Sequence, residues 1–323
     1  MRIAVTGSIA TDHLMTFPGR FTDQLVPGKM ETVSLSFLVD ALEIRRGGIA
    51  ANIAFGMACL GLRPVLVGAV GADFDDYRSW LERKGVDTAS VHVSELRHTA
   101  RFLCTTDVDQ NQIASFYAGA MSEARNIELG PVADRLGGLD LVVISPNDPE
   151  AMLRHTAECR ERGIPFAADP SQQLARMDGA EIRELVDGAF YLFTNEYETA
   201  LTEQKTGWSH DEVLSRVKTR VTTMGPKGAR IDRADEPSVA IPAVQVERPA
   251  DPTGGGDAFR AGFLSALAWG LSLERSAQLG NMIAVHALET VGPQEYELQR
   301  ESLLTRFASA YGDGATAEIA AHL

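Results

Sequence analysis

The sequence predicts an α/β fold with a mainly parallel central sheet that is flanked by helices. Short apolar runs alternate with helical patterns over most of the chain, and this alternation is typical of strand–helix–strand crossover units. After residue 257 the pattern becomes almost entirely helical. Two further stretches alternate like exposed antiparallel strands and predict a second, smaller sheet. No repeat or interdomain linker interrupts the pattern, so we expect residues 1–323 to form a single domain.

Each element follows from its own pattern. Apolar runs predict buried strands at residues 2–7, 64–71, 139–145, 164–170, 191–195 and 220–225. Helical patterns cover residues 50–60, 75–84, 149–162, 178–187, 210–217, 257–269, 273–289 and 298–311, and the tail ATAEIAAHL predicts a weak terminal helix. A sheet of this kind binds its ligand at the carboxyl ends of its strands. The polar residues expected there are Ser8, Asp12, Asp169, Asn195 and Thr223.

The two alternating stretches, residues 30–42 and 99–120, flank the predicted helix 50–60 and strand 64–71. We interpret them as one small β-sheet lid, discontinuous in sequence and built from about residues 13–46 and 98–120. Such a lid could cover the site. The alternative is a surface hairpin without a role.

Composition narrows the function classes. The chain has 45% hydrophobic and 23% charged residues and a formal net charge of −14, which argues against a nucleic-acid or membrane partner. A small anionic ligand remains compatible, because a few oriented amides outweigh the global field locally. The three cysteines show no CxxC spacing and the histidines no HExxH motif. With no apolar run typical of a signal peptide or a membrane span, we expect a cytoplasmic protein with reduced thiols.

The stretch ADPTGGGDAFRAGF, residues 250–263, is the strongest candidate site. Gly254, Gly255 and Gly256 allow backbone N–H groups to converge on an anion, and the helix that follows adds its N-terminal dipole. Asp257 stands at the same place, where the first helical turn favours an ionised carboxylate. It is a candidate weak base for phosphoryl transfer, in which positioning dominates. The alternative is a glycine-rich turn with Asp257 as an N-cap.

This stretch and RRGGIAANIAFGMACLG, residues 45–61, resemble the two signature regions of the ribokinase-like (PfkB) family of small-molecule kinases. The second signature of that family reads D-T-x-G-A-G-D, and this chain departs from it with Pro252 and Gly255. We call the converging N–H groups of Gly254, Gly255 and Gly256 the glycine nest. Neither change removes one of these N–H groups or the Asp257 carboxylate. TNEYE (194–198) matches the family's N-x-x-E, and TMGPKG (223–228) matches its T-x-G-x-x-G nucleotide loop. The resemblance extends over essentially the whole chain and implies a ribokinase-like fold.

The resemblance implies that Asp257 is the catalytic base and that the amides of Gly254, Gly255 and Gly256 hold the transferring phosphoryl group. It also implies that Mg²⁺ accompanies ATP, and that K⁺ is a possible activator. The residues that it assigns to the donor are Asn195, Thr223, Gly225, Gly228 and Gly256 for ATP, Asn195 and Glu198 for Mg²⁺ through waters, and Asp251 and Thr253 for K⁺. Glu198 could instead be a solvated helix residue.

The resemblance implies that the acceptor site holds a sugar ring. Asp12 could accept hydrogen bonds from two vicinal hydroxyls, or it could be a turn residue. Phe102 and Phe116, with Phe37 nearby, could stack on a purine base; they could equally form the lid's own core or a dimer interface. Segments such as VTGSIATDHL, SLSFLVD and FAADPSQQLAR resemble the bacterial adenosine kinases of this family. By that resemblance the acceptor contacts are Ser8, Asp12, Ser36, Gly48, Asn52, Phe102, Phe116, Gln172, Gln173 and Arg176, with Arg176 also a candidate phosphate contact.

The sequence therefore predicts an adenosine kinase that makes AMP and ADP and acts in purine salvage, as a homodimer paired through its lids. Three alternatives stay open at this point: a ribose or fructose kinase, a kinase for another nucleoside such as inosine or guanosine, and a silent nucleoside-binding protein. A nicotinamide-dependent dehydrogenase is disfavoured, because VTGSIA after the first strand lacks G-x-G-x-x-G.

Overall fold

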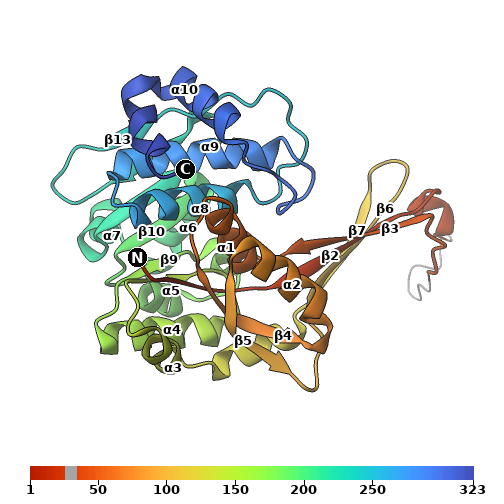
Figure 1. The fold of residues 1–323 in the computed structure, drawn as a ribbon. Coiled ribbons are helices and arrows are strands. Elements are labelled where there is room, and N and C mark those ends of the chain that lie inside the picture. The colour runs from red at the N-terminus through yellow and green to blue at the C-terminus, as the bar shows by residue number, and fades with distance from the viewer. Residues whose placement is uncertain (26–34) are drawn as a thin grey trace.

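A nine-stranded sheet runs through the centre of the computed structural model, which describes residues 1–25 and 35–323 (Figure 1). Its strand order is β13-β12-β11-β10-β9-β8-β1-β4-β5. Strands β11 to β5 in that order are parallel, whereas β12 and β13 are antiparallel at one edge. The mainly parallel sheet is thus confirmed. Its strands are β1 (Ile3–Thr6), β4 (Val65–Gly71), β5 (Asp87–Ser94), β8 (Leu141–Ile144), β9 (Phe166–Ala168), β10 (Tyr191–Asn195), β11 (Thr219–Thr223), β12 (Ala229–Asp232) and β13 (Val239–Ile241).

Helices cover both faces of this sheet, because successive strand residues point to opposite sides. Val5 and Val143 pack into one core, and their neighbours Ala4 and Val142 pack into the other. The first core lies under α1 (Ile49–Cys59), α2 (Asp75–Lys84), α8 (Gly255–Ala268), α9 (Leu273–Leu288) and α10 (Arg300–Ala320). The second lies under α3 (Leu129–Leu136), α4 (Pro149–Arg162), α5 (Gly179–Val186), α6 (Glu196–Thr206) and α7 (His210–Arg216).

A second sheet, with the order β3-β2-β6-β7, projects away from this body (Figure 1). Its strands are β2 (Ala10–Thr16), β3 (Ala41–Gly47), β6 (Ala100–Thr106) and β7 (Gln112–Tyr117). The predicted strands within residues 99–120 are confirmed as β6 and β7. We call this second sheet the lid.

Two expectations about the lid are wrong. Asp12 does not lie at the end of the first strand, because a separate strand, β2, carries it into the lid. Residues 35–40 of the predicted strand 30–42 are not a strand, and β3 begins only at Ala41; residues 30–34 lie outside the described residues. Phe37 instead packs its ring 5.0 Å from the rings of both Phe17 and Phe21, so tertiary contacts override the alternating pattern there.

The remaining predicted helices appear within one or two residues of their expected ends, and the tail continues the last helix to Ala320 past a non-helical Gly312. Sequence patterns missed α3, α6, β5, β12 and β13. Within residues 1–25 and 35–323, every helix is too short or too polar to span a lipid bilayer.

Candidate active site

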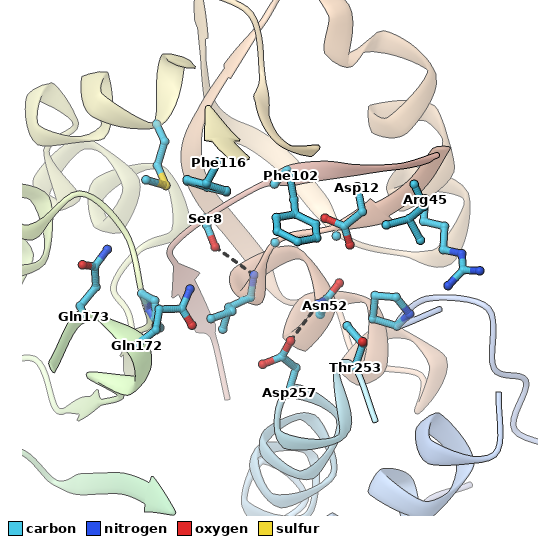
Figure 2. Close-up of a pocket in the computed structure, with 18 of the residues that line it drawn as sticks. Ser8, Asp12, Arg45, Asn52, Phe102, Phe116, Gln172, Gln173, Thr253 and Asp257 are labelled. Carbon is cyan, nitrogen blue, oxygen red and sulfur yellow. Dashed lines mark hydrogen bonds between the residues drawn. The ribbon is translucent and has the colours of Figure 1, made fainter. Parts of the chain in front are cut away.

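One transverse row of lid residues faces a cavity of about 570 Å³ between the lid and the body (Figure 2). Arg45 in β3 is paired with Asp12 in β2, Asp12 with Phe102 in β6, and Phe102 with Phe116 in β7. Directly opposed residues of a sheet share one face, and all four line the cavity. The row therefore places a carboxylate beside two aromatic rings. We call this cavity the acceptor cavity.

The body supplies the opposite wall of the acceptor cavity. Ser8 Oγ accepts a hydrogen bond from Ile49 N at 3.0 Å and so holds the start of α1 (Figure 2). Gly48, the N-cap of α1, has a φ of 93°, and a Cβ there would lie 2.6 Å from Ser8 O and Ala10 N. Only glycine fits this turn. Ser8, Gly48 and Asn52 thus lie together, as the sequence predicts.

Asn52 reaches from α1 to the predicted base. Its Nδ2 donates a hydrogen bond to Asp257 Oδ2 at 2.8 Å (Figure 2). The orientation of this amide is fixed from behind, because Gln294 Nε2 donates to Asn52 Oδ1 at 2.9 Å. Gln294 Nε2 also contacts the hydroxyl of Tyr77, which itself donates to Gly47 O. Sequence reasoning missed Gln294 and Tyr77, and no local motif marks either residue.

Asp257 lies in the first turn of α8 and is not its N-cap. The N-cap is Gly254, with a φ of 78°, and the Asp257 carboxylate bonds to Asn52 rather than to the helix backbone. Removal from bulk water raises the pKa of Asp257 to about 6, and Arg260 and the Asn52 hydrogen bond oppose that rise. The pKa of this carboxyl group is thus higher than the position in the first helical turn alone would give. The carboxylate is a stronger base than an ordinary aspartate and is still mostly ionised at neutral pH.

A second cavity of about 270 Å³, which we call the donor cavity, meets the first at Ile49, Gln172 and Asp257. Gly254 and Gly256 line it, whereas Gly255 turns toward α9, where a Cβ would lie 3.0 Å from Leu288 Cδ2. Besides Gly256, the predicted donor residues that line this cavity are Asn195, Glu198 and Thr223.

Asn195 and Glu198 form a reciprocal cap at the start of α6. Asn195 N donates to Glu198 Oε2, and Glu198 N donates to Asn195 Oδ1, each at 2.8 Å. Glu198 Oε1 accepts no hydrogen bond from the part of the chain that the structure describes. Carboxylate and amide oxygens held this way fit a hydrated Mg²⁺, which prefers oxygen ligands and keeps several waters.

Three predicted residues sit elsewhere. Gly225 lines a third cavity of about 670 Å³ between its turn and α9. Gly228 lines none of these three cavities; its φ of 94° and a Cβ position 2.1 Å from Ile241 O show that it serves the turn between β11 and β12. Ser36 is exposed in the segment before β3 and is not among the residues that line the acceptor cavity.

Asp251 and Thr253 border the acceptor cavity. Asp251 Oδ1 accepts from Thr253 N at 2.9 Å, and Asp251 Oδ2 accepts from Gly292 N at 3.1 Å and faces Arg45 Nη1 at 3.4 Å. The Arg45 guanidinium therefore already neutralises part of the charge that a monovalent cation would meet.

Gln172, Gln173 and Arg176 line the acceptor cavity from the turn after β9. Gln173 Nε2 donates to Asn147 O at 2.6 Å, which leaves its buried Oε1 without a partner in the described chain. Arg176 borders the acceptor cavity but not the donor cavity. The arginine that does line the donor cavity is Arg260, which sequence reasoning missed, as it missed Arg45 in the lid row.

Comparison with known proteins agrees with this geometry. The family model of the pfkB family carbohydrate kinases matches residues 6–299. The nucleoside kinase of Methanocaldococcus jannaschii is 32% identical over 77% of this chain and 80% of its own length. The structure of Burkholderia thailandensis nucleoside kinase in complex with inosine is 36% identical, with a TM-score of 0.84 over 96% of this chain and 99% of that one. The same kinase in complex with ADP-inosine gives a TM-score of 0.81, with 36% identity over 96% of each chain.

The family match covers the lid and the residues that line the acceptor and donor cavities, so the resemblance that the motifs predict is confirmed. The chain belongs to the pfkB family of carbohydrate kinases and is an ATP-dependent phosphotransferase with a hydroxyl acceptor.

Proposed function

We propose that this protein is a nucleoside kinase that transfers the terminal phosphoryl group of ATP to the 5′-hydroxyl of adenosine, giving AMP and ADP. The observation that carries the proposal is the lid row of Asp12, Phe102 and Phe116 over Asp257. The Asp12 carboxylate can accept two hydroxyl hydrogen bonds from a ribose, and the two rings offer stacking faces to a base. A free sugar would bind Asp12 but would leave the rings of Phe102 and Phe116 without a base to stack on.

The relatives support a nucleoside acceptor. The two similar kinases named above are nucleoside kinases, and the one from B. thailandensis is described in complex with inosine. Inosine is therefore the second candidate acceptor. It carries the same ribose as adenosine and differs in the group at the purine 6-position.

In the transfer, Asp257 accepts the proton of the attacking hydroxyl, and the amides of the Gly254–Gly256 nest hold the phosphoryl oxygens. Because the transition state is loose, positioning and charge stabilisation supply most of the catalysis. Asn195 and Glu198 would hold the hydrated Mg²⁺ that neutralises charge on the phosphates. Thr223 lines the donor cavity beside them, and Gly225 lines the third cavity, which we assign to the nucleoside of ATP.

Potassium activation stays a prediction for Asp251 and Thr253. Arg45 partly neutralises Asp251, so we expect the rate in K⁺ to exceed the rate in Na⁺, by less than about tenfold. Equal rates in both salts would remove the cation from the proposal.

We also propose a cytoplasmic homodimer paired through the lids and acting in purine salvage. The lid face that points away from the acceptor cavity carries Leu42, Ile44 and Ile113, which are 57%, 59% and 45% exposed. Exposed apolar faces and free strand edges favour a partner, and a second lid is the simplest one. Light scattering at assay concentration tests this, and a monomeric mass would contradict it.

The decisive experiment is an acceptor panel of adenosine, inosine, guanosine, ribose and fructose with MgATP, in which ADP and the phosphorylated product are both quantified. We expect adenosine to give the highest kcat/KM, with inosine next. A leading free sugar would show that the lid row does not recognise a base. Nucleoside binding without any ADP would make the chain a silent binding protein. Asp257→Asn is the control that separates phosphoryl transfer from contaminating kinases.

A further inference from the structure

A buried ion pair lies directly behind the glycine nest and takes no part in the transfer as described so far. Arg260 in α8 is 7% exposed, and Asp169, which follows β9, is 0% exposed. Arg260 Nη2 donates a hydrogen bond to Asp169 Oδ1 at 2.5 Å. The Arg260 guanidinium carbon also lies 5.8 Å from the centre of the Phe193 ring. Charge pairing and ring packing therefore hold this side chain in one position.

Most of the hydrogen-bonding capacity of Arg260 is unused. Nη2 makes the one hydrogen bond of this guanidinium within residues 1–25 and 35–323, so Nη1 has no acceptor there, and Nε is buried without one. Burying the N–H donors of a charged group without hydrogen-bond acceptors costs free energy. An ordered ligand that accepts from Nη1 would relieve part of that cost.

Nη1 is the end of the side chain that reaches the nest. A Cβ placed on Gly256 would lie 3.0 Å from Arg260 Nη1, so the nitrogen stands next to the Gly256 backbone. Arg260 and Gly256 both line the donor cavity. Glycine at position 256 thus leaves room for the guanidinium as well as exposing its own amide.

The charged side chains around the donor cavity are mostly acidic, and Arg260 is their cationic counterpart. The cavity is lined by the carboxylates of Glu198 and Asp257, and Arg260 is the sole cationic side chain among its described lining residues. Asp169 adds a third carboxylate behind it, and burial raises the pKa of Asp169 to about 7 although Arg260 opposes that rise. Backbone amides carry no net charge, so beside the hydrated Mg²⁺ proposed at Asn195 and Glu198, Arg260 is the described side chain of this cavity that can offset phosphate charge.

We propose that Arg260 is a catalytic residue whose Nη1 donates a hydrogen bond to a non-bridging oxygen of the transferring phosphoryl group, and that Asp169 is the residue that positions it. In that step the bond from the acceptor oxygen to phosphorus forms, the bond from phosphorus to the bridging oxygen of ADP breaks, and the hydroxyl proton passes to Asp257. Arg260 stays protonated throughout, as guanidinium groups in proteins do. The proposal rests on the phosphoryl transfer proposed above.

The test compares Arg260→Gln, Arg260→Lys and the double variant Asp169→Asn/Arg260→Gln in the full-length protein, with the acceptor that the wild type uses best. We expect Arg260→Gln to lower kcat by about 100-fold, the typical effect of removing one transition-state donor, with little change in the KM for the nucleoside. Arg260→Lys keeps the charge but lacks the planar guanidinium, which can donate to Asp169 and to a phosphoryl oxygen at once. We therefore expect about a tenfold loss of kcat.

The double variant separates a chemical role from a structural one. If Arg260 only neutralises Asp169, removing both charges together restores kcat to near the wild-type value and overturns the proposal. We expect instead that thermal stability recovers while kcat stays low. Should Arg260→Gln alone fail to fold, the double variant and Arg260→Lys still decide, and an unchanged kcat in Arg260→Lys would also overturn the proposal.

A readout beside turnover is the affinity for ADP with aluminium fluoride, a mimic of the transferring phosphoryl group, measured in the presence of nucleoside. We expect Arg260→Gln to weaken this complex and to leave nucleoside affinity unchanged; equal affinities in the two proteins would contradict the assignment. Arg220→Gln is the matched control, since Arg220 is also buried and paired with a carboxylate, Glu203, but lines none of the three cavities described above. If the wild-type protein phosphorylates no acceptor, the proposed function itself is contradicted, and this outcome is distinct from failure of the Arg260 assignment.

Discussion

Asn52 Nδ2 lies 2.8 Å from Asp257 Oδ2, and this hydrogen bond ties the start of α1 to the start of α8 across 205 positions of sequence. The bond brings together the helices that carry the acceptor wall and the phosphate nest. It also occupies one oxygen of the base, whereas the other, Oδ1, accepts no hydrogen bond from residues 1–25 and 35–323.

Replacing the base tests this geometry most directly. We expect Asp257→Asn to lower kcat by about 1,000-fold, within the range for loss of a general base. The amide keeps the size of the side chain, so nucleoside affinity, measured by calorimetry, should change by less than about threefold. A variant with near wild-type kcat would show that Asp257 is not the base.

The pH dependence of kcat/KM should follow the ionisation of Asp257. Its pKa is raised to about 6 by removal from water, and only the ionised form accepts a proton. Activity should therefore be fully present well above pH 6 and fall as the pH drops through that value. Asn52→Ala removes a hydrogen bond that favours the ionised form, so it should move this acid limb to higher pH. An acid limb near pH 4, or one that Asn52→Ala leaves in place, would contradict this assignment.

Gln294 should act through the orientation of Asn52. Gln294→Leu removes the donor to Asn52 Oδ1, so the amide is free to turn its oxygen toward the carboxylate. We expect a loss of kcat of about tenfold, the usual scale for one lost hydrogen bond to a charged group, and an upward shift of the acid limb.

The control for that variant is Gln278→Leu. Gln278 is a buried glutamine of α9 that accepts a hydrogen bond from Arg275 and lines none of the three cavities described above. If both variants lose activity equally and neither shifts the pH profile, Gln294 has a structural role only.

The lid row predicts a face-specific effect on nucleoside binding. Phe116 faces the acceptor cavity, whereas its neighbour Tyr117 points to the opposite face of β7, and the two are 48% and 42% exposed. We expect Phe116→Ala to raise the KM for adenosine by about tenfold through lost base stacking. Tyr117→Ala should leave that KM unchanged, and KM for ATP should stay constant in both. Equal effects of the two substitutions on the KM for adenosine would show that the row does not contact the base.

Much of the fold follows from sequence pattern alone. The alternation of apolar runs with helical patterns placed β1, β4, β8, β9, β10 and β11 and most of the helices. The glycine run before Asp257 and the motif around Asn195 could be recognised because their chemistry is local. Consecutive amides form a nest, and a residue three positions along a helix closes a cap.

The tertiary structure decided what depends on distant neighbours. Whether Asp257 behaves as an ordinary or a strengthened base depends on how much water α1 and α8 exclude from it, which no local pattern records. The lid row exists only because β2, β3, β6 and β7 pair in one register, and that pairing sends Phe102 and Phe116 to the cavity while Phe37 joins an aromatic cluster elsewhere. The sequence pattern predicts only that Arg260 lies in a helix, whereas the tertiary structure places Asp169 beside it. Local motifs thus identified the phosphoryl-transfer site of this protein, and long-range packing determined which distant side chains line it.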